Sequence, residues 1–476
     1  MTVLTPHRLA KPALPQGFRV ELSDDTKVCD GGRLLLGTSS GVVLRLRPHA
    51  VERLRGRALV VSDATSATLA RALLVRGLAD PAWSDDSSRR DLSDLTVVVP
   101  VRDRPRQLDR LLATVPASVP VMVVDDGSTD PSSVAAVAAE HGAGLLRHDR
   151  SRGPAEARNA GIRSATTGLV ALIDSDVLLE PGTLTTLRRH LDDPAVAVVG
   201  PRVLSIEQRP TGWIARYEAA RSSLDLGPRP ARVAPGTRVS YLPSAALLVR
   251  RAALGDGFDG SMQVAEDVDL IWRLTSAGHE VRYAPEAVVR HEHRIDVRDW
   301  MNRKVFYGSG AQLLAERHGD LVAPMRLSAS SALAVAAVLA QRPWSAPVAV
   351  TALAAGGTRS AYRLRSVDHP VRTAAALTAM TGAGALWQTA SSLTRHHWPA
   401  AVAAALVSQR ARRAVVVAAV AEAVADHRRV RPDLDLARYA VAHRLDDLAY
   451  GWGLWAGAWR ARSARALLPS LHERKL

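Results

Sequence analysis

The chain has few of the residues and segments that mark secreted proteins. Among its 476 residues there is one cysteine, Cys29, so no disulfide can form within the chain. This composition favours a reducing compartment. Residues 1–18 contain no continuous apolar segment of the kind found in a signal peptide. We therefore expect the bulk of the chain to face the cytosol.

Lysine is nearly absent as well. All but four of the 62 basic residues are arginine, and together they give a net charge of +15 against 47 acidic residues. Such a charge can indicate nucleic acid or an anionic membrane surface as partner. However, abundant arginine, alanine and valine are also what a genome-wide codon bias produces. No basic stretch is interleaved with aromatic residues and no zinc-ligand cluster is present, so we expect no nucleic-acid partner.

Long hydrophobic runs are few and confined to the C-terminal third. Residues 327–341 and 343–358 carry no charge, but each is shorter than the roughly 20 residues that span a bilayer. Residues 373–394 are long enough but rich in threonine and glycine. Arginine and tryptophan flank these segments, which is typical of helices at a membrane interface. We expect residues 319–476 to form an Ala-rich helical region on the cytoplasmic face of the membrane; buried helices of a soluble domain and a spanning hairpin are the alternatives.

The central part of the chain has the pattern of an α/β domain. Residues 97–100, 121–126 and 169–173 are apolar, largely β-branched runs bounded by turn residues, as in strands buried in a parallel sheet. Residues 106–115 have the pattern of a crossover helix between the first two strands. Ligands of such sheets bind beyond the carboxyl ends of the strands. Five aspartates fall there: Asp103, Asp125, Asp126, Asp174 and Asp176.

Asp174 and Asp176 end the third of these runs with a spacing suited to metal binding. Residues two apart in an extended segment share a face, so both carboxylates can point at one ion. Mg²⁺ and Mn²⁺ take carboxylate oxygens and complete their shells with substrate phosphates. A solvated turn is the alternative for an isolated Asp-x-Asp.

Together with three other motifs, this pattern resembles the family 2 glycosyltransferases with the glycosyltransferase A fold. The motifs are VVDDGSTD at 123–130, G-x-x-x-ARN-x-G at 153–161 and ED-x-DL-x-x-R at 266–273, and the resemblance covers residues 94–310. It implies a nucleotide-sugar donor, with Pro100 and Asp126 at the nucleoside and Arg158 beside the nucleoside or the diphosphate. It also implies that Asp176 and Asp174 hold Mg²⁺ or Mn²⁺.

The resemblance further implies that Asp267 is the general base of an inverting transfer. Chemically, one carboxylate must take the proton of the attacking hydroxyl on the side of the sugar opposite the diphosphate. Asp267 opens a segment of helical periodicity, residues 268–277, and carboxylates in a first helical turn are also favoured by the helix dipole alone. Glu266 and Asp269 are expected to support Asp267.

Two neighbouring segments fit the same site less specifically. Residues 243–246 are small and follow the strand-like residues 239–242, so an acceptor could approach the backbone there; close packing is an equal explanation. His291 and His293 follow an apolar run, and either could reach the metal or the diphosphate. A hydrogen-bonded structural pair of histidines is the more common arrangement.

The first 90 residues are expected to form a separate α+β domain. Residues 18–22, 27–29 and 34–36 are strand-like and separated by turns, which favours a small β-meander, and helices are expected at 48–54 and 65–76. This layout is similar to winged-helix-like modules that bind a leader peptide by strand addition. A structural cap on the catalytic domain, residues 91–318, is the alternative.

The whole arrangement resembles the glycosyltransferases of the mycofactocin system. That resemblance implies transfer of glucose from UDP-glucose to a peptide-derived cofactor precursor, with oligoglycosylation. The competing hypotheses are a nucleotidyltransferase, a membrane-associated polysaccharide or lipid glycosyltransferase, and a peptide-binding scaffold without activity. The processivity motif Gln-x-x-Arg-Trp is missing, since Gln341 to Trp344 read QRPW.

Overall fold

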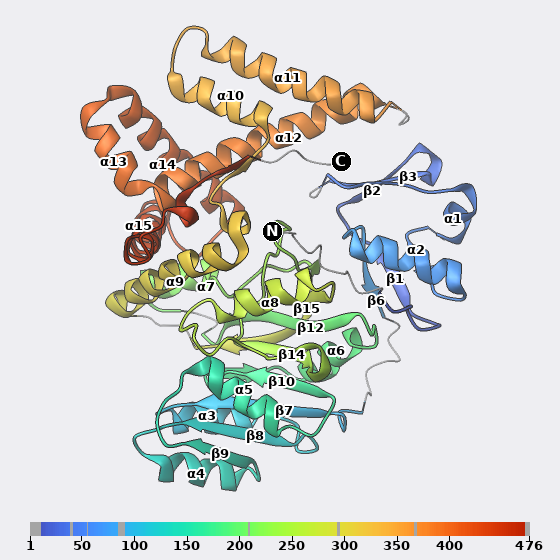
Figure 1. Ribbon diagram of the computed structural model, residues 1–476, viewed down its shortest axis with the longest axis vertical. Coiled ribbons are helices and arrows are strands. Elements are labelled where there is room, and N and C mark those ends of the chain that lie inside the picture. Colours follow the sequence, from blue (N-terminus) through green and yellow to red (C-terminus); the bar gives the residue numbers. More distant parts are fainter. Residues whose placement is uncertain are drawn as a thin grey trace, which may run out of the picture. The chain divides into compact units, whose positions relative to one another are not determined.

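The computed structural model describes residues 11–38, 41–54, 56–83, 91–207, 210–292, 296–365 and 369–471. The chain forms two compact units (Figure 1). The first, here the sheet unit, comprises residues 1–27, 46–208 and 222–293. The second, here the helical unit, comprises residues 28–45, 209–221 and 294–476. In this grouping, residues 28–45, 209–221 and 296–318 lie with the C-terminal helices. The division into domains at residues 91 and 319 stays a prediction.

A nine-stranded mixed sheet is the centre of the sheet unit. Its strands follow the order β11-β15-β12-β14-β10-β7-β8-β9, with β13 paired to β15. The part formed by β10, β7, β8 and β9 is parallel, and β14 runs antiparallel to β10. The bounds are β7 Leu95–Val101, β8 Val121–Asp126, β9 Gly144–His148, β10 Leu169–Ile173, β11 Val177–Leu179, β12 Val196–Ser205, β13 Ala231–Arg232, β14 Ala246–Arg250 and β15 Glu280–His291. The three strands and the crossover helix expected from the sequence are confirmed.

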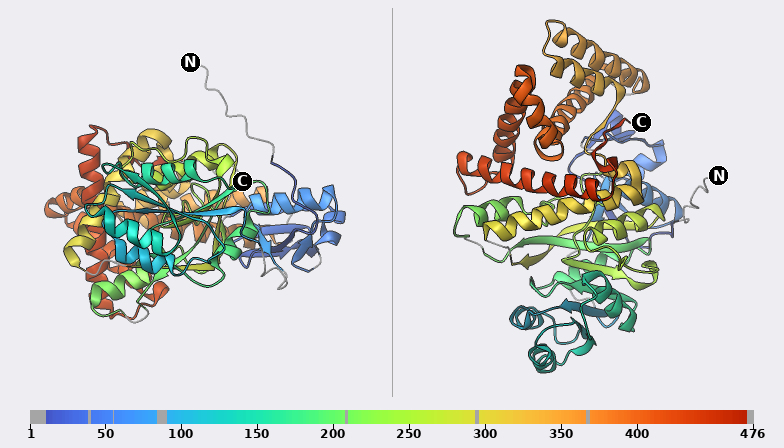
Figure 2. Two further views of the ribbon diagram at one scale, coloured as in Figure 1. Left: turned by 90° about the horizontal axis from the view of Figure 1, so that it is seen from below. Right: turned by 60° about the vertical axis from the view of Figure 1, so that its left-hand side comes forward.

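Helices cover both faces of this sheet (Figure 2). One face packs against α3 (Pro105–Leu112), α4 (Pro131–Glu140) and α6 (Thr183–His190). On the other face, α5 (Pro154–Ser164) approaches β7 and β8 so closely that a Cβ at Gly161 would overlap Val98 and lie 3.2 Å from Val124 Cγ2. The apolar runs of β7 and β8 are therefore buried on both sides, as their composition predicts.

The N-terminal strands pair differently from the expected meander. Strand β1 (Arg19–Leu22) pairs antiparallel with β5 (Ala58–Val60) and β6 (Ala79–Ala82), and not with β2 (Thr26–Cys29). The reason is that both edges of β1 are taken: Leu22 N–H donates to Arg57 O at 2.8 Å, and Ser23 N–H donates to Leu78 O at 3.1 Å. Strand β2 instead forms a second sheet with β3 (Leu34–Gly37) and β4 (Val43–Arg45).

The two expected N-terminal helices are confirmed as α1 (Pro48–Arg53) and α2 (Ala64–Val75). Helix α2 is tied to the large sheet by a buried ion pair. Arg71 donates to both oxygens of Asp193 at 2.6 Å, and Asp193, which is fully buried, also pairs with Arg282 on β15. A contact of this kind is expected if the N-terminal segment is a structural cap on the catalytic domain.

The helical unit contains the segments expected to be helical. The bounds are α7 Trp213–Arg221, α9 Val297–His318, α10 Ala329–Ala340, α11 Ser345–Arg363, α12 Pro370–Ser391, α13 Trp398–Val407, α14 Gln409–Val430 and α15 Leu436–Arg460, with a π-helical turn at Ser392–His396 and a short pair of strands, β16 Arg326–Leu327 and β17 Ser470–Leu471. Helices α9 and α15 cross with their backbones in contact, since a Cβ at Gly308 or Gly453 would overlap a carbonyl of the other helix. Within the described ranges, none of the helices combines the length and the apolar character needed to cross a bilayer.

Candidate active site

The aspartates singled out in the sequence gather at one edge of the sheet. Asp103 follows β7, Asp125 and Asp126 end β8, and Asp174 and Asp176 follow β10. Because β10, β7 and β8 are parallel neighbours, their carboxyl ends lie side by side. This edge is the candidate active site.

Asp126 is the most fully hydrogen-bonded of these carboxylates. It accepts hydrogen bonds from the N–H groups of Arg152 and Gly153 at 2.8 and 2.9 Å, from Ser151 Oγ at 2.7 Å, and lies 2.8 Å from His148 Nδ1. Burial alone would raise the pKa of Asp126, but these hydrogen bonds outweigh it and the pKa is lowered. Asp126 is thus an ionised anchor of the loop at 148–153, and its contact with a nucleoside stays a prediction.

Asp125 and Asp103 shape the loop that follows β8. Asp125 is buried, accepts from Ser128 N–H at 2.9 Å and pairs with Arg147. Asp103 has a left-handed backbone with φ 56° and accepts from Thr129 N–H at 2.7 Å. These side chains bind the protein's own backbone, so they position the DDGS loop.

Pro100 sits where the sheet can accept a residue without an N–H group. Val97 donates its N–H to Pro120 O, on the side of β8. Successive N–H groups of a strand point to opposite sides, so the N–H groups of the even-numbered residues of β7 point toward β10. Pairing with β10 ends at Val98. Pro100 therefore removes no ladder bond, and its contact with the nucleoside remains a prediction.

Arg158 on α5 connects two of the expected motifs. Its guanidinium donates to Asp174 Oδ1 at 2.7 Å and to Glu266 Oε1 at 3.1 Å, and the side chain is buried against the ring of Phe258. Burial lowers the pKa of Arg158, but the charges of Asp174 and Glu266 more than offset this effect and the pKa is raised. The Asp-x-Asp segment and the acidic start of α8 are thereby held together by one permanent cation.

The other residues of the 153–161 motif have structural roles. Gly153 has φ 92°, which favours glycine, and starts α5 ahead of Pro154. The Asn159 side chain exchanges two hydrogen bonds with the backbone of Phe258, at 2.8 and 2.9 Å. The motif therefore fixes both the loop beside Asp126 and the loop that leads to α8.

Asp176 lies between an arginine and a histidine. It pairs with Arg104, and its Oδ1 lies 3.5 Å from His291 Nε2. His291 is on β15, opposite Val177 of β11, so pairing of these two strands brings it to Asp176. His293 lies outside the described residues. Carboxylate oxygens with one imidazole nitrogen suit Mn²⁺ or Mg²⁺ at this point, although Arg104 and Arg158 already bind one oxygen of Asp176 and of Asp174.

Asp267 is held in the first turn of α8 (Glu266–Ser276). Its Oδ2 accepts from Ser244 N–H at 3.2 Å and its Oδ1 accepts from Val268 N–H at 2.8 Å. Burial, together with the charge of Glu266, raises the pKa of Asp267 to about 7. A carboxyl group with this pKa is suited to take a proton near neutral pH.

The other two acidic residues of α8 have partners of their own. Glu266 binds Arg158, while Asp269 is buried and accepts from Arg273 at 2.7 Å. Arg273 also donates to Gly257 O at 2.6 Å. Both residues are thus paired with arginines, and their support of Asp267 stays a prediction.

The small segment before β14 enters the site through its backbone. Ser244 donates its N–H to Asp267, which gives residues 243–246 a part in positioning this carboxylate. The strand expected at 239–242 is reduced to an isolated bridge between Val233 and Val239. The next carbonyl, Ser240 O, accepts a side-chain hydrogen bond from Trp272 Nε1 at 2.8 Å.

Two residues at this edge were missed in the sequence. Arg104 pairs with Asp176 and His148 contacts Asp126. Each lies at the carboxyl end of a strand, Arg104 after β7 and His148 at the end of β9. That position is the signal that could have identified them.

The sheet edge thus brings together paired aspartates, a buried arginine and a separate carboxyl group of raised pKa, which is the arrangement that the sequence predicts for a nucleotide-sugar transferase of the glycosyltransferase A fold. Residues 96–258 match the family described as "Glycosyl transferase family 2". The pre-mycofactocin glycosyltransferase of Mycobacterium tuberculosis is 42% identical over 468 residues, which cover 96% of this chain and 98% of that protein. The chain belongs to this family of pre-mycofactocin glycosyltransferases.

Other relatives match over shorter spans. The succinoglycan biosynthesis protein ExoU of Rhizobium meliloti is 30% identical over 222 residues, covering 42% of this chain and 63% of that protein. Among solved structures, the mannosyltransferase PcManGT from Pyrobaculum calidifontis, in complex with GDP-Man and Mn²⁺, aligns with a TM-score of 0.37 and 22% identity, covering 61% of this chain and 86% of that one.

Proposed function

We propose that this glycosyltransferase transfers glucose from UDP-glucose to the peptide-derived redox core of mycofactocin, with inversion at the anomeric carbon and with a divalent metal ion. The observation that carries the proposal is Asp267, a carboxyl group whose pKa is raised to about 7 and which two backbone N–H groups hold in place. The 42% identity to a pre-mycofactocin glycosyltransferase supports the acceptor.

The reaction needs one base on the side of the acceptor. The acceptor hydroxyl attacks the anomeric carbon as the bond to the diphosphate breaks, and its proton passes to the Asp267 carboxylate. A single displacement of this kind inverts the configuration. Hydrogen bonds from Ser244 N–H and Val268 N–H fix the direction of the carboxylate, so its free lone pairs can face the hydroxyl.

The nucleoside diphosphate that leaves needs positive charge beside it. Asp174 and Asp176 would hold the metal ion, with His291 as a further donor, and the bound ion would stabilise the charge that develops on the diphosphate. Arg158 adds a fixed cation next to Asp174. Asp174 and Asp176 thereby lie at the donor, and Asp267 at the acceptor.

Mass spectrometry of the redox core tests the proposal. We expect successive additions of a hexose mass when the core is incubated with the protein, UDP-glucose and Mn²⁺ or Mg²⁺, and release of UDP. Release of pyrophosphate would indicate a nucleotidyltransferase. UDP-glucose binding without any hexose addition would contradict the acceptor and direct the search to lipid or polysaccharide acceptors.

A further inference from the structure

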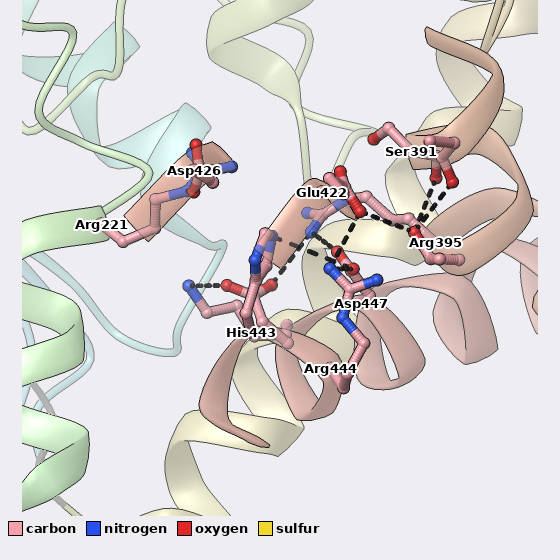
Figure 3. A network of polar contacts seen from close by, with 12 residues as sticks. Arg221, Ser391, Arg395, Glu422, Asp426, His443, Arg444 and Asp447 are labelled. Carbon is pink, nitrogen blue, oxygen red and sulfur yellow. Dashed lines mark hydrogen bonds and ion pairs between the residues drawn. The ribbon is translucent and has the colours of Figure 1, made fainter. Parts of the chain in front are cut away.

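The helical unit holds a buried group of metal-ligand side chains that the proposed reaction does not use. Glu422 on α14 and His443 and Asp447 on α15 are 3%, 2% and 2% exposed. One potential ligand atom from each lies within 4.8 Å of the others. His443 and Asp447 are four residues apart on one face of α15 and look toward Glu422 (Figure 3).

Within the part of the chain that the structure describes, His443 Nδ1 is buried without a hydrogen-bond partner. Asp447 Oδ2 likewise makes no hydrogen bond, although it forms an ion pair with Arg444 Nη2 at 3.0 Å. The other ring nitrogen, His443 Nε2, is 4.0 Å from Asp447 Oδ2, which is too long for a hydrogen bond. Buried polar atoms are nearly always paired, because leaving them unpaired costs free energy. A buried imidazole with an unpaired nitrogen beside two carboxylates therefore indicates a missing partner.

Arg444 now provides the positive charge between the carboxylates. Its Nη2 lies 2.9 Å from Glu422 Oε2 and 3.0 Å from Asp447 Oδ2. Its Nε and Nη1 have no hydrogen-bond partner among the described residues, so the guanidinium fits this position poorly. The side chain is 23% exposed, unlike the three ligand residues, so it has a path to solvent.

The charges around the group are balanced by a doubly positive ion. Five buried carboxylates form the network: Glu218, Glu422, Asp426, Asp446 and Asp447. Three cations stay among them, since Lys304 lies 2.8 Å from Glu218, Arg395 lies 2.9 Å from Asp447 and Arg221 lies 2.8 Å from Asp426. When Arg444 turns to solvent, two more negative charges than these three cations remain, with the exposed Arg429 as a second partner of Asp426.

We propose that Glu422, His443 and Asp447 bind a divalent transition-metal ion such as Zn²⁺ or Mn²⁺, with Arg444 moving to solvent. One imidazole nitrogen and two carboxylate oxygens form a common donor set for such ions. The ligands come from α14 and α15, so the ion cross-links these helices. The site is separate from the donor site at Asp176 and independent of the proposed reaction.

Metal content of the full-length protein tests the site. Chelator-treated protein is dialysed against Zn²⁺, and the bound ion is counted by mass spectrometry. We expect the Asp176→Asn variant to keep a bound ion. Adding either His443→Gln or Glu422→Gln to this variant should remove that ion. An Asp176→Asn protein that binds no ion, or one that still binds it after His443→Gln, would overturn the proposal.

Thermal unfolding separates a metal site from a purely ionic network. Arg444→Ala removes the cation that bridges Glu422 and Asp447, so in chelator we expect Tm to fall by about 5–10 °C. Added Zn²⁺ should restore Tm in Arg444→Ala but not in Arg444→Ala combined with His443→Gln. Arg429→Ala is the matched control, because Arg429 is exposed and its buried partner Asp426 keeps Arg221 as a second cation, so this variant should show no such rescue. Failure of Zn²⁺ to restore Tm in Arg444→Ala would contradict the site.

Discussion

Opposing effects act on the pKa of the Asp267 carboxyl group. Burial and the charge of Glu266 favour its neutral form, while two backbone N–H groups and Arg158 favour the charged form. The result is a pKa of about 7, which leaves a carboxylate that is available near neutral pH and is a stronger base than an ordinary aspartate. At the residue scale, the proposed chemistry depends on this balance.

Removing the base should separate turnover from donor binding. In Asp267→Asn we expect kcat to fall by about 10²- to 10⁴-fold, the usual contribution of general base catalysis, with UDP-glucose affinity unchanged. Steady-state kinetics and calorimetric titration of UDP-glucose give the two quantities. Near-normal turnover would remove Asp267 from the role of base.

The raised pKa predicts a pH dependence. The base must be deprotonated, so kcat/KM should fall tenfold per pH unit as the pH drops below about 7. The sign for stability is also defined: a carboxyl group whose pKa is raised on folding stabilises the folded state below its unfolded pKa, and this contribution is lost as pH rises through about 7. Unfolding of wild type and Asp267→Asn at pH 6 and 8 should therefore show that the variant gains stability relative to wild type at pH 8. An identical pH dependence in both proteins would contradict the assignment.

Asp176 should affect the donor instead of the base. In Asp176→Ala we expect the metal-dependent part of UDP-glucose binding to be lost, because the carboxylate that would hold the ion is removed. Titration of UDP-glucose with and without Mn²⁺ measures this part. Equal enhancement by Mn²⁺ in the variant and the wild type would show that Asp176 is not a ligand.

At the element scale, the parallel strands were the most predictable part of the fold. Strands β8 and β10 have the bounds expected from their apolar runs, since a buried parallel strand carries its signal in its own composition. The pairing of β1 could not be predicted, because the hydrogen bonds to Arg57 and Leu78 come from residues more than 30 positions away. Local turn signals favour a meander and cannot exclude this alternative.

The two candidate sites also differ in how far the sequence predicts them. Asp174, Asp176 and Asp267 lie in short motifs, so the sequence identified them. Glu422 and His443 come from two different helices, and only the four-residue spacing of His443 and Asp447 on α15 could have indicated their site. The hydrogen bonds that occupy Asp126 depend on the folded loop at 148–153, which no sequence pattern describes.

The contact between α5 and the sheet predicts a stability effect. Alanine inside a helix is ordinarily more stable than glycine by about 1 kcal/mol. At Gly161, however, the added Cβ would overlap Val98, so we expect Gly161→Ala to destabilise the protein by about 1–3 kcal/mol. Gly168→Ala is the control, since a Cβ there meets no atom within 4 Å. Urea denaturation measures both, and stabilisation by Gly161→Ala would show that α5 has room to move.

At the scale of the whole molecule, charge and apolar surface meet in the helical unit. Leu406 and Val407 at the end of α13 are 76% and 88% exposed. The first two turns of α14 (Gln409–Val430) then carry the exposed arginines Arg410, Arg412 and Arg413. Apolar side chains next to clustered arginines are typical of proteins that bind anionic lipid surfaces. Attachment to the cytoplasmic face of the membrane therefore stays a prediction, made more specific by these residues.

Sedimentation with lipid vesicles tests this prediction. We expect the full-length protein to pellet with vesicles that contain phosphatidylglycerol, to bind phosphatidylcholine vesicles more weakly, and to be released partly by salt, because screening weakens the attraction of arginine for anionic lipid. Replacing Leu406 and Val407 with glutamate should reduce binding to anionic vesicles several-fold without changing Tm, since both side chains are exposed. If the protein stays in the supernatant with anionic vesicles at low salt, these side chains do not bind lipid and the prediction is wrong. The +15 charge would then reflect codon bias alone.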